Sequence, residues 1–124
     1  MNIALWIVAG VLAAAFLAAG LMKITGKREQ MVERMAWVAD YSQTQVKLIG
    51  VVEVLGAIGL ILPALTGIAP ILVPVAATGL VITSVLAAVM HIRRGDGVGS
   101  AVPVLVLGLL AAFVAWGRFG AYAF

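Results

Sequence analysis

The sequence of 124 residues contains no cysteine and only one histidine. The absence of thiols excludes disulfide bonds, thiol redox chemistry and thiolate metal sites. A single imidazole beside few carboxylates also supplies too few ligands for a metal centre, so no metal site is expected. A redox role would therefore need a bound cofactor or a partner subunit.

Charged residues are scarce as well. They make up 10% of the chain, against about 25% in a soluble domain, whereas hydrophobic residues make up 65% and the mean hydropathy is +1.21. Such a chain cannot cover a globule with polar surface, so a lipid bilayer is its expected environment. The net charge of +3 does not indicate nucleic acid, because the basic residues lie between apolar segments, where loops meet anionic lipid.

Four apolar segments alternate with polar ones, at about residues 3–22, 48–62, 70–90 and 101–117. The first carries no charge and is long enough to cross roughly 30 Å of hydrocarbon as a helix. A signal peptide is the alternative, but Met1-Asn2 lacks the basic start that such a peptide has. The second helix is expected to begin near Ser42–Gln45 and to end at Pro63. The predicted fold is all-α, an integral membrane bundle of four transmembrane helices.

The connections carry most of the polar residues. In the first, residues 23–47, Met31, Met35 and Val38 recur at helical spacing. This pattern indicates either a short helix lying on the membrane or an amphipathic connector packed on the end of the bundle. In the third, residues 91–97 are expected to form a polar turn whose glycines stop the preceding helix.

The basic residues are distributed unevenly between the two ends of the predicted bundle. Only Arg118 falls on the side of the termini, and we expect it to act as an orientation residue that extends toward the interface. By the excess of basic residues, the loops 23–47 and 91–100 are predicted to be cytoplasmic and both termini outside, in the plasma (inner) membrane. The basic residues of the two loops are Lys23, Lys27, Arg28, Arg34, Lys47, Arg93 and Arg94.

Glu53 lies in an otherwise uncharged run. A carboxyl group within a bilayer costs roughly 2.5–3.5 kcal/mol even on lenient insertion scales, so it is a candidate for a functional site. Its neighbours three and four positions away include Gly50, Gly56 and Ala57. Small residues let transmembrane helices approach closely, so Glu53 is predicted to face the interior of the bundle.

Two partners are predicted for Glu53 at the loop side of the bundle. Lys23 closes the first span there and His91 closes the third, so three helices bring an ammonium, an imidazole and a carboxyl toward one layer. Tyr41, Gln43 and Gln45 could cover this layer from the connecting loop. Two structural alternatives remain. The charges could form a buried network that only fixes helix packing, and His91 could be an interfacial residue bonded to a carbonyl.

Four segments of the chain carry a family resemblance. They are AAGLMK at 18–23, IGVVEVLGAIGLILP at 49–63, AAVMH at 87–91 and GR at 117–118. With them the chain resembles the DoxX-like family of small four-helix membrane proteins, as a single domain of residues 1–124. The resemblance marks a polar site of Lys23, Glu53 and His91. The helix-packing glycines expected around that site are Gly20, Gly50, Gly56 and Gly59.

The resemblance implies a redox-associated membrane subunit. Some family members are linked to a thiosulfate:quinone oxidoreductase and others resemble partners of redox-stress enzymes. The polar site would then hold a quinone headgroup, or another small polar ligand, in a pocket open to lipid between the second and third spans. The alternatives are a structural or assembly protein, which could associate with itself, and a small transporter. No catalytic residue is assigned, and whether the chain is an enzyme stays open.

Overall fold

The computed structural model describes the backbone of residues 1–124 and all side chains except those of Arg28 and Arg34. These two basic residues, which were counted in predicting the orientation, therefore lie outside the described side chains. Within the described chain, four helices are long and apolar enough to cross a membrane, which confirms the predicted all-α membrane bundle. The elements in chain order are α1 (Asn2–Thr25), α2 (Arg28–Arg34), the 3₁₀ helix η1 (Ala36–Asp40), α3 (Gln43–Thr66), α4 (Leu72–Arg94) and α5 (Val98–Phe119).

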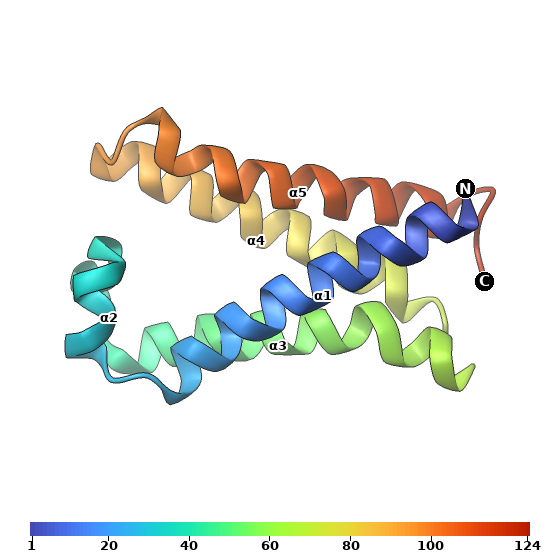
Figure 1. The fold of residues 1–124 in the computed structure, drawn as a ribbon, viewed down its shortest axis with the longest axis horizontal. Helices are drawn as coiled ribbons and strands as arrows, with labels where there is room; N and C mark the ends of the chain where they lie inside the picture. The colour runs from blue at the N-terminus through green and yellow to red at the C-terminus, as the bar shows by residue number, and fades with distance from the viewer.

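The long helices form two closely packed pairs, α1 with α3 and α4 with α5 (Figure 1). Both termini lie at one end of the bundle, which we call the terminal end, and α2 and η1 lie at the other, the loop end. At the terminal end the pairs converge, because Leu5 of α1 packs against Gly117 of α5; a Cβ atom there would lie 2.7 Å from the Leu5 side chain. Toward the loop end α1 and α5 diverge (Figure 1).

Helix α3 begins where the sequence predicted and ends later. Ser42 accepts a hydrogen bond from the Gln45 N–H and the Gln45 side chain accepts one from the Ser42 N–H, which forms a capping box. The prediction that Pro63 ends this helix is wrong. Pro63 is buried inside it, and the helix continues to Thr66 before Gly67 (φ 70°). Transmembrane helices tolerate an internal proline because neighbouring groups satisfy the backbone that it frees.

The last two helices also extend beyond their predicted bounds. Helix α4 continues through His91 to Arg94, so these residues form its last turn instead of a loop. It ends at Gly95, whose φ of 77° lies in the left-handed region that favours glycine. Helix α5 runs to Phe119 and therefore includes Arg118. Basic side chains are favourable in a last turn, where they complement the helix dipole.

The first connection contains two short helices instead of one. The backbone is extended at Met35 (φ −130°), between α2 and η1. Met31 and Val38 are buried together with Val46 at the start of α3. The structure thus favours a connector packed on the end of the bundle over a separate helix lying on the membrane.

Candidate functional site

Lys23 and Glu53 form a buried ion pair at the loop end. Lys23 comes from the last turn of α1 and Glu53 from the middle of α3, and the Lys23 Nζ donates directly to the Glu53 Oε1. Their side chains are only 10% and 6% exposed. Glu53 therefore faces the interior, as its small helix neighbours predicted.

The pair can form because α1 and α3 cross at two glycines. A Cβ atom added to Gly20 would lie 2.6 Å from the Gly50 carbonyl oxygen, and one added to Gly50 would lie 2.6 Å from that of Gly20. The same Cβ on Gly50 would come within 2.9 Å of the Lys23 Cβ. Such contact between backbones requires the absence of side chains on both helices. Larger residues would separate the helices that carry the two charges.

The other two predicted packing glycines lie between α3 and α4. A Cβ atom on Gly56 would come within 2.6 Å of Leu80, and one on Gly59 within 2.7 Å of Ala76. These distances leave no space for a side chain, so both glycines bring α4 against the helix that carries Glu53.

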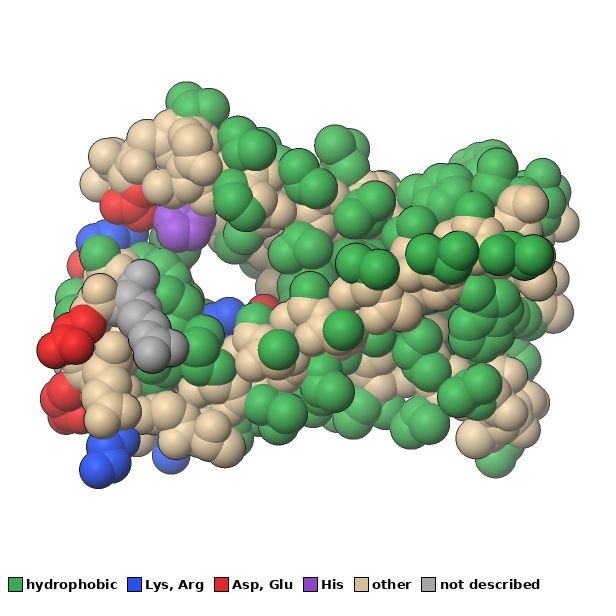
Figure 2. All heavy atoms as spheres, in the orientation of Figure 1, with side chains coloured by type: hydrophobic (Ala, Val, Ile, Leu, Met, Phe, Trp, Pro, Cys, Tyr) green, Lys and Arg blue, Asp and Glu red, His purple; other side chains and the backbone are tan. Residues whose placement is uncertain are grey.

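A cavity of about 850 Å³ lies beside the ion pair. Lys23, Glu53 and His91 all line it, together with residues of α5 and the connector. This volume lies within the roughly 300–1,000 Å³ of typical ligand pockets. In Figure 2 the hollow opens between α1 and α5, with the purple imidazole at its rim. This opening lies where α1 and α5 diverge. Val52 of the second span and Leu86 of the third also line the cavity.

The walls of the cavity are mostly apolar. Phe16 and Val52 are among the residues that line it, and Trp37 and Tyr41 approach from the connector. This position of Tyr41 agrees with the prediction that it covers the polar layer from the connecting loop. Gln43 and Gln45 are exposed instead, and Gln45 is used in the cap of α3.

His91 lines the cavity from α4, but its hydrogen-bond partner is Asp96. The imidazole Nδ1 lies 2.9 Å from the Asp96 Oδ2. The structural alternative predicted that His91 bonds a carbonyl, but its partner in the structure is a carboxylate. Asp96 was missed because the sequence Arg94-Gly-Asp-Gly was interpreted only as a turn. The signal that could have found it is Gly95, since a glycine that ends a helix brings the following residue back toward the last turn.

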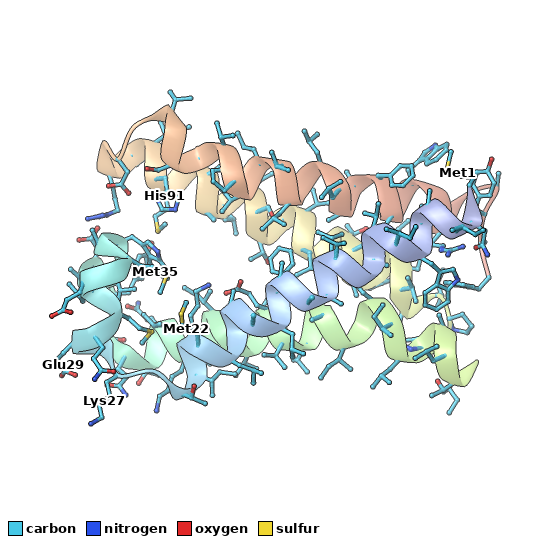
Figure 3. The ribbon with its side chains drawn as sticks, in the orientation of Figure 1. Met1, Met22, Lys27, Glu29, Met35 and His91 are labelled. Atoms are coloured by element: carbon cyan, nitrogen blue, oxygen red, sulfur yellow. The ribbon has the colours of Figure 1, made fainter. Side chains whose placement is uncertain are left out.

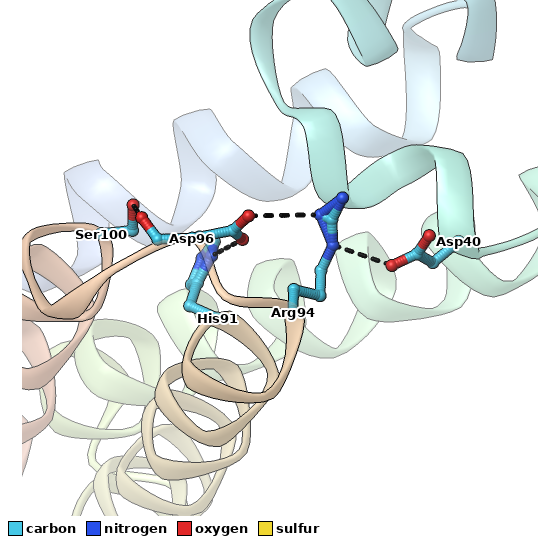
Figure 4. Close-up of polar contacts among 5 residues, drawn as sticks. All are labelled: Asp40, His91, Arg94, Asp96 and Ser100. Carbon is cyan, nitrogen blue, oxygen red and sulfur yellow. Dashed lines mark hydrogen bonds and ion pairs between the residues drawn. The ribbon is translucent and has the colours of Figure 1, made fainter.

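The end of α4 holds Asp96 in place. The Asp96 N–H donates to the His91 carbonyl and the Gly95 N–H to that of Ile92, each at 3.1 Å, which is the pattern of a Schellman motif. Arg94 also contacts the Asp96 Oδ1 at 3.5 Å and donates through Nε to the Asp40 Oδ2 at 2.8 Å (Figure 4). The chain Asp40–Arg94–Asp96–His91 thus links η1 to α4 across the loop end.

The sequence model of the DoxX-like family matches residues 7–114. The chain belongs to the DoxX-like family. The match includes Lys23, Glu53, His91 and Asp96 and ends before Arg118. Searches of curated proteins and of solved structures found no match. Membership thus assigns this DoxX-like protein to a family of multi-pass membrane proteins without assigning a ligand.

The described residues of the DoxX-like protein contain no cluster of three or more His, Asp or Glu side chains that could hold a metal ion. The polar groups at the cavity are instead arranged as the two pairs described above. Ser84 also lines the cavity, and its Oγ is buried without a hydrogen-bond partner. A cavity with these walls can bind a molecule that has a polar group next to an apolar part.

A second buried cation lies at the terminal end. Arg118 is only 3% exposed, and its Nη1 donates to the Asn2 Oδ1 at 2.6 Å and to the Tyr122 carbonyl at 2.9 Å. The guanidinium also lies 4.0 Å from the ring centroid of Phe124. The Arg118 guanidinium thus lies at the terminal end of the bundle, where residues at the two ends of the chain cover it. The residues after α5 turn back over it, with the Tyr122 N–H bonded to the Gly117 carbonyl.

Proposed function

We propose that this DoxX-like protein is a redox-associated membrane subunit that binds a quinone-like amphiphile in the cavity at the loop end. The observation that carries the proposal is the combination of a buried ion pair and an imidazole on the walls of one largely apolar cavity of about 850 Å³. An amphiphile with a polar ring and an apolar tail matches such walls.

The residues present fit a quinone-like head. An ammonium has three donors, and Lys23 uses one of them on Glu53. A second can reach a ligand oxygen. The ring of Trp37, whose centroid lies 5.8 Å from the Lys23 Nζ, provides an aromatic wall, as does Phe16. A bound quinone supplies reversible electron and proton transfer, which this cysteine-free chain would use together with a redox-enzyme partner.

The excess of basic residues in the loops supports a cytoplasmic position for the loop end. The cavity would then open near the inner leaflet of the plasma membrane, and both termini would lie outside. A cytoplasmic enzyme could approach the site through η1 and the end of α4.

Tryptophan fluorescence can test the proposal, because quinones quench nearby indoles. Trp37 lines the cavity, whereas Trp6 and Trp116 lie toward the terminal end. A Trp6→Phe/Trp116→Phe variant in nanodiscs would report on the cavity alone, and a Trp37→Phe variant would serve as its matched control. We expect decylubiquinone to quench Trp37 saturably and to quench the control only in proportion to its concentration in the lipid.

Glu53→Gln tests whether the Lys23–Glu53 pair contributes to ligand binding. This change keeps the shape of the side chain and removes its charge, so we expect the affinity measured through Trp37 to fall by about tenfold, the equivalent of about one charge-assisted hydrogen bond. Identical quenching curves for the Trp37 reporter and its control would refute the proposal.

The alternative is a structural or assembly protein in which the polar layer only fixes helix packing. The direct Lys23–Glu53 bond beside the Gly20–Gly50 crossing favours it. A charge swap, Lys23→Glu with Glu53→Lys, separates the two functions. A packing role requires only opposite charges, so the swapped protein would fold and associate normally. A ligand site needs the ammonium on α1 and would lose its affinity.

A further inference from the structure

Asp96 gives the proposed cavity a specific hydrogen-bonding character. We infer that Asp96 is a positioning residue that fixes the proton of His91 on Nδ1 and presents Nε2 to the cavity as an acceptor. The site then selects an amphiphile whose head donates a hydrogen bond through a hydroxyl group. This inference rests on the proposed function, since it names the kind of ligand that the same cavity takes.

The geometry at His91 determines which ring nitrogen has the proton. The Nδ1 lies 2.9 Å from the Asp96 Oδ2, and an ionised carboxylate can only accept hydrogen bonds. In the neutral imidazole the proton must therefore be on Nδ1, which leaves Nε2 with a free lone pair. The His91 side chain is only 16% exposed and lines the cavity. In Figure 3 it projects from α4 toward the side of the connector that carries Met35.

The orientation of the Asp96 carboxylate is set by its contacts. Its two oxygens have different partners, because Oδ1 faces Arg94 and Oδ2 faces His91. The backbone of Asp96 is held on both sides: its N–H donates to the His91 carbonyl, and its own carbonyl accepts a hydrogen bond from the Ser100 Oγ at 2.9 Å. The backbone contacts hold Asp96 beside His91, and turning its carboxylate away would break the contacts of Oδ2 with His91 and of Oδ1 with Arg94.

The groups on the cavity walls determine which ligand head fits. The cavity presents a donor, the Lys23 ammonium, on α1 and an acceptor, the His91 Nε2, on α4. The Glu53 Oε1 already accepts from Lys23, so the His91 Nε2 is the neutral acceptor outside that ion pair. A hydroquinone satisfies both when one of its hydroxyl groups accepts and the other donates, and a phenol does so through its one hydroxyl, which can accept and donate. For a quinone-like ligand the reduced, hydroxylated form is then held more tightly than the oxidised form.

The tautomer can be observed without any ligand. Because His91 is the only histidine, protein labelled with ¹⁵N-histidine gives the signals of this one imidazole in solid-state or solution NMR. We expect the proton on Nδ1 in the wild type. Asp96→Asn should lose this preference, because an amide can donate to Nδ1 and so allow the other tautomer. Asp40→Asn, which removes the negative charge of the second partner of Arg94, is the matched control and should keep it.

The ligand class is tested with two probes, 4-nonylphenol and 4-nonylanisole, in which the ring oxygen has a hydrogen or a methyl group, so that only the phenol can donate. Their binding is followed through Trp37 in the single-tryptophan variant. We expect the wild-type cavity to prefer the phenol by about tenfold, the effect of about one hydrogen bond. The preference should fall to within about twofold in Asp96→Asn and persist in Asp40→Asn.

His91→Phe provides a second variant should Asp96→Asn fold poorly. It keeps a ring in the cavity and removes the acceptor, so it must abolish the preference for the phenol. Each of three results would overturn the inference. The wild type could bind the two probes with equal affinity, the preference for the phenol could survive in Asp96→Asn or His91→Phe, or the wild-type proton could be on Nε2. If decylubiquinone binds while the probes are not distinguished, the proposed function stands and this inference fails. If no probe quenches Trp37 saturably, both fail.

Discussion

The two ends of the bundle each bury one cation and do so differently. At the loop end, Lys23 is paired with Glu53 beside a cavity of about 850 Å³. At the terminal end, Arg118 is bonded to a side-chain amide and a carbonyl and lies against an aromatic ring. Among the described side chains no carboxylate pairs with Arg118. The difference teaches that a buried charge alone does not indicate a ligand site, whereas a buried charge on the wall of a cavity makes that wall a candidate for one.

The chemistry of the two cations explains their partners. A guanidinium is planar, delocalised and weakly hydrated, so neutral acceptors and ring faces can replace its water. An ammonium is a compact and strongly hydrated charge, which favours a carboxylate partner away from water. The helices converge around Arg118 and diverge toward the loop end, where the cavity lies (Figure 1).

The largest effect is expected from breaking the ion pair. Glu53→Leu leaves the Lys23 charge buried without compensation, and we expect the free energy of unfolding to fall by about 3–5 kcal/mol. Unfolding by sodium dodecyl sulfate from mixed micelles, followed by circular dichroism, measures this loss.

The double variant Lys23→Met/Glu53→Leu is the control for that measurement. Replacing both charges with apolar side chains removes the uncompensated charge, so most of the lost stability should return, although decylubiquinone binding should not. Losses that simply add in the double variant would show that the two residues do not stabilise each other.

A smaller effect is expected at the terminal end. Arg118→Met removes hydrogen bonds from a charged donor to Asn2 and Tyr122, and it should lower the free energy of unfolding by about 1.5–3 kcal/mol. Quinone affinity at the distant cavity should stay within about twofold, as judged by Trp37 quenching. The exposed Arg93 supplies the matched change, Arg93→Met, which should cost less than about 0.5 kcal/mol. A loss of quinone binding in Arg118→Met would contradict the separation of the two ends.

The smallest effect concerns two adjacent hydroxyl groups at the cavity. The Ser84 Oγ is buried without a hydrogen-bond partner, whereas the Thr83 Oγ1 donates to the Gly79 carbonyl at 2.9 Å. Ser84→Ala should leave stability unchanged or raise it by up to about 1 kcal/mol, because it removes an unsatisfied group. Thr83→Val should lower it by about 0.5–1 kcal/mol. Thermal unfolding in the same detergent compares them, and destabilisation by Ser84→Ala would show that its hydroxyl has a partner.

The sequence predicted the features that depend on local pattern. Hydropathy located the four spans, and the small residues around Glu53 predicted the face that it occupies. Features that depend on the path of the backbone were missed. Asp96 reaches His91 only because Gly95 turns the chain back, and Arg118 is buried only because the tail folds over it. The opening between α1 and α5 follows from how these two helices diverge, which residue spacing does not encode.

The turn at the end of α4 also sets a rule for how this part of the protein can evolve. The carboxylate meets the imidazole because five positions separate them and a left-handed glycine stands immediately before the acid. Inserting or deleting one residue between His91 and Asp96 would rotate the acid away from the ring, however conservative the new side chain. In relatives that keep this pair, insertions should therefore accumulate in other loops, and this loop should keep a constant length.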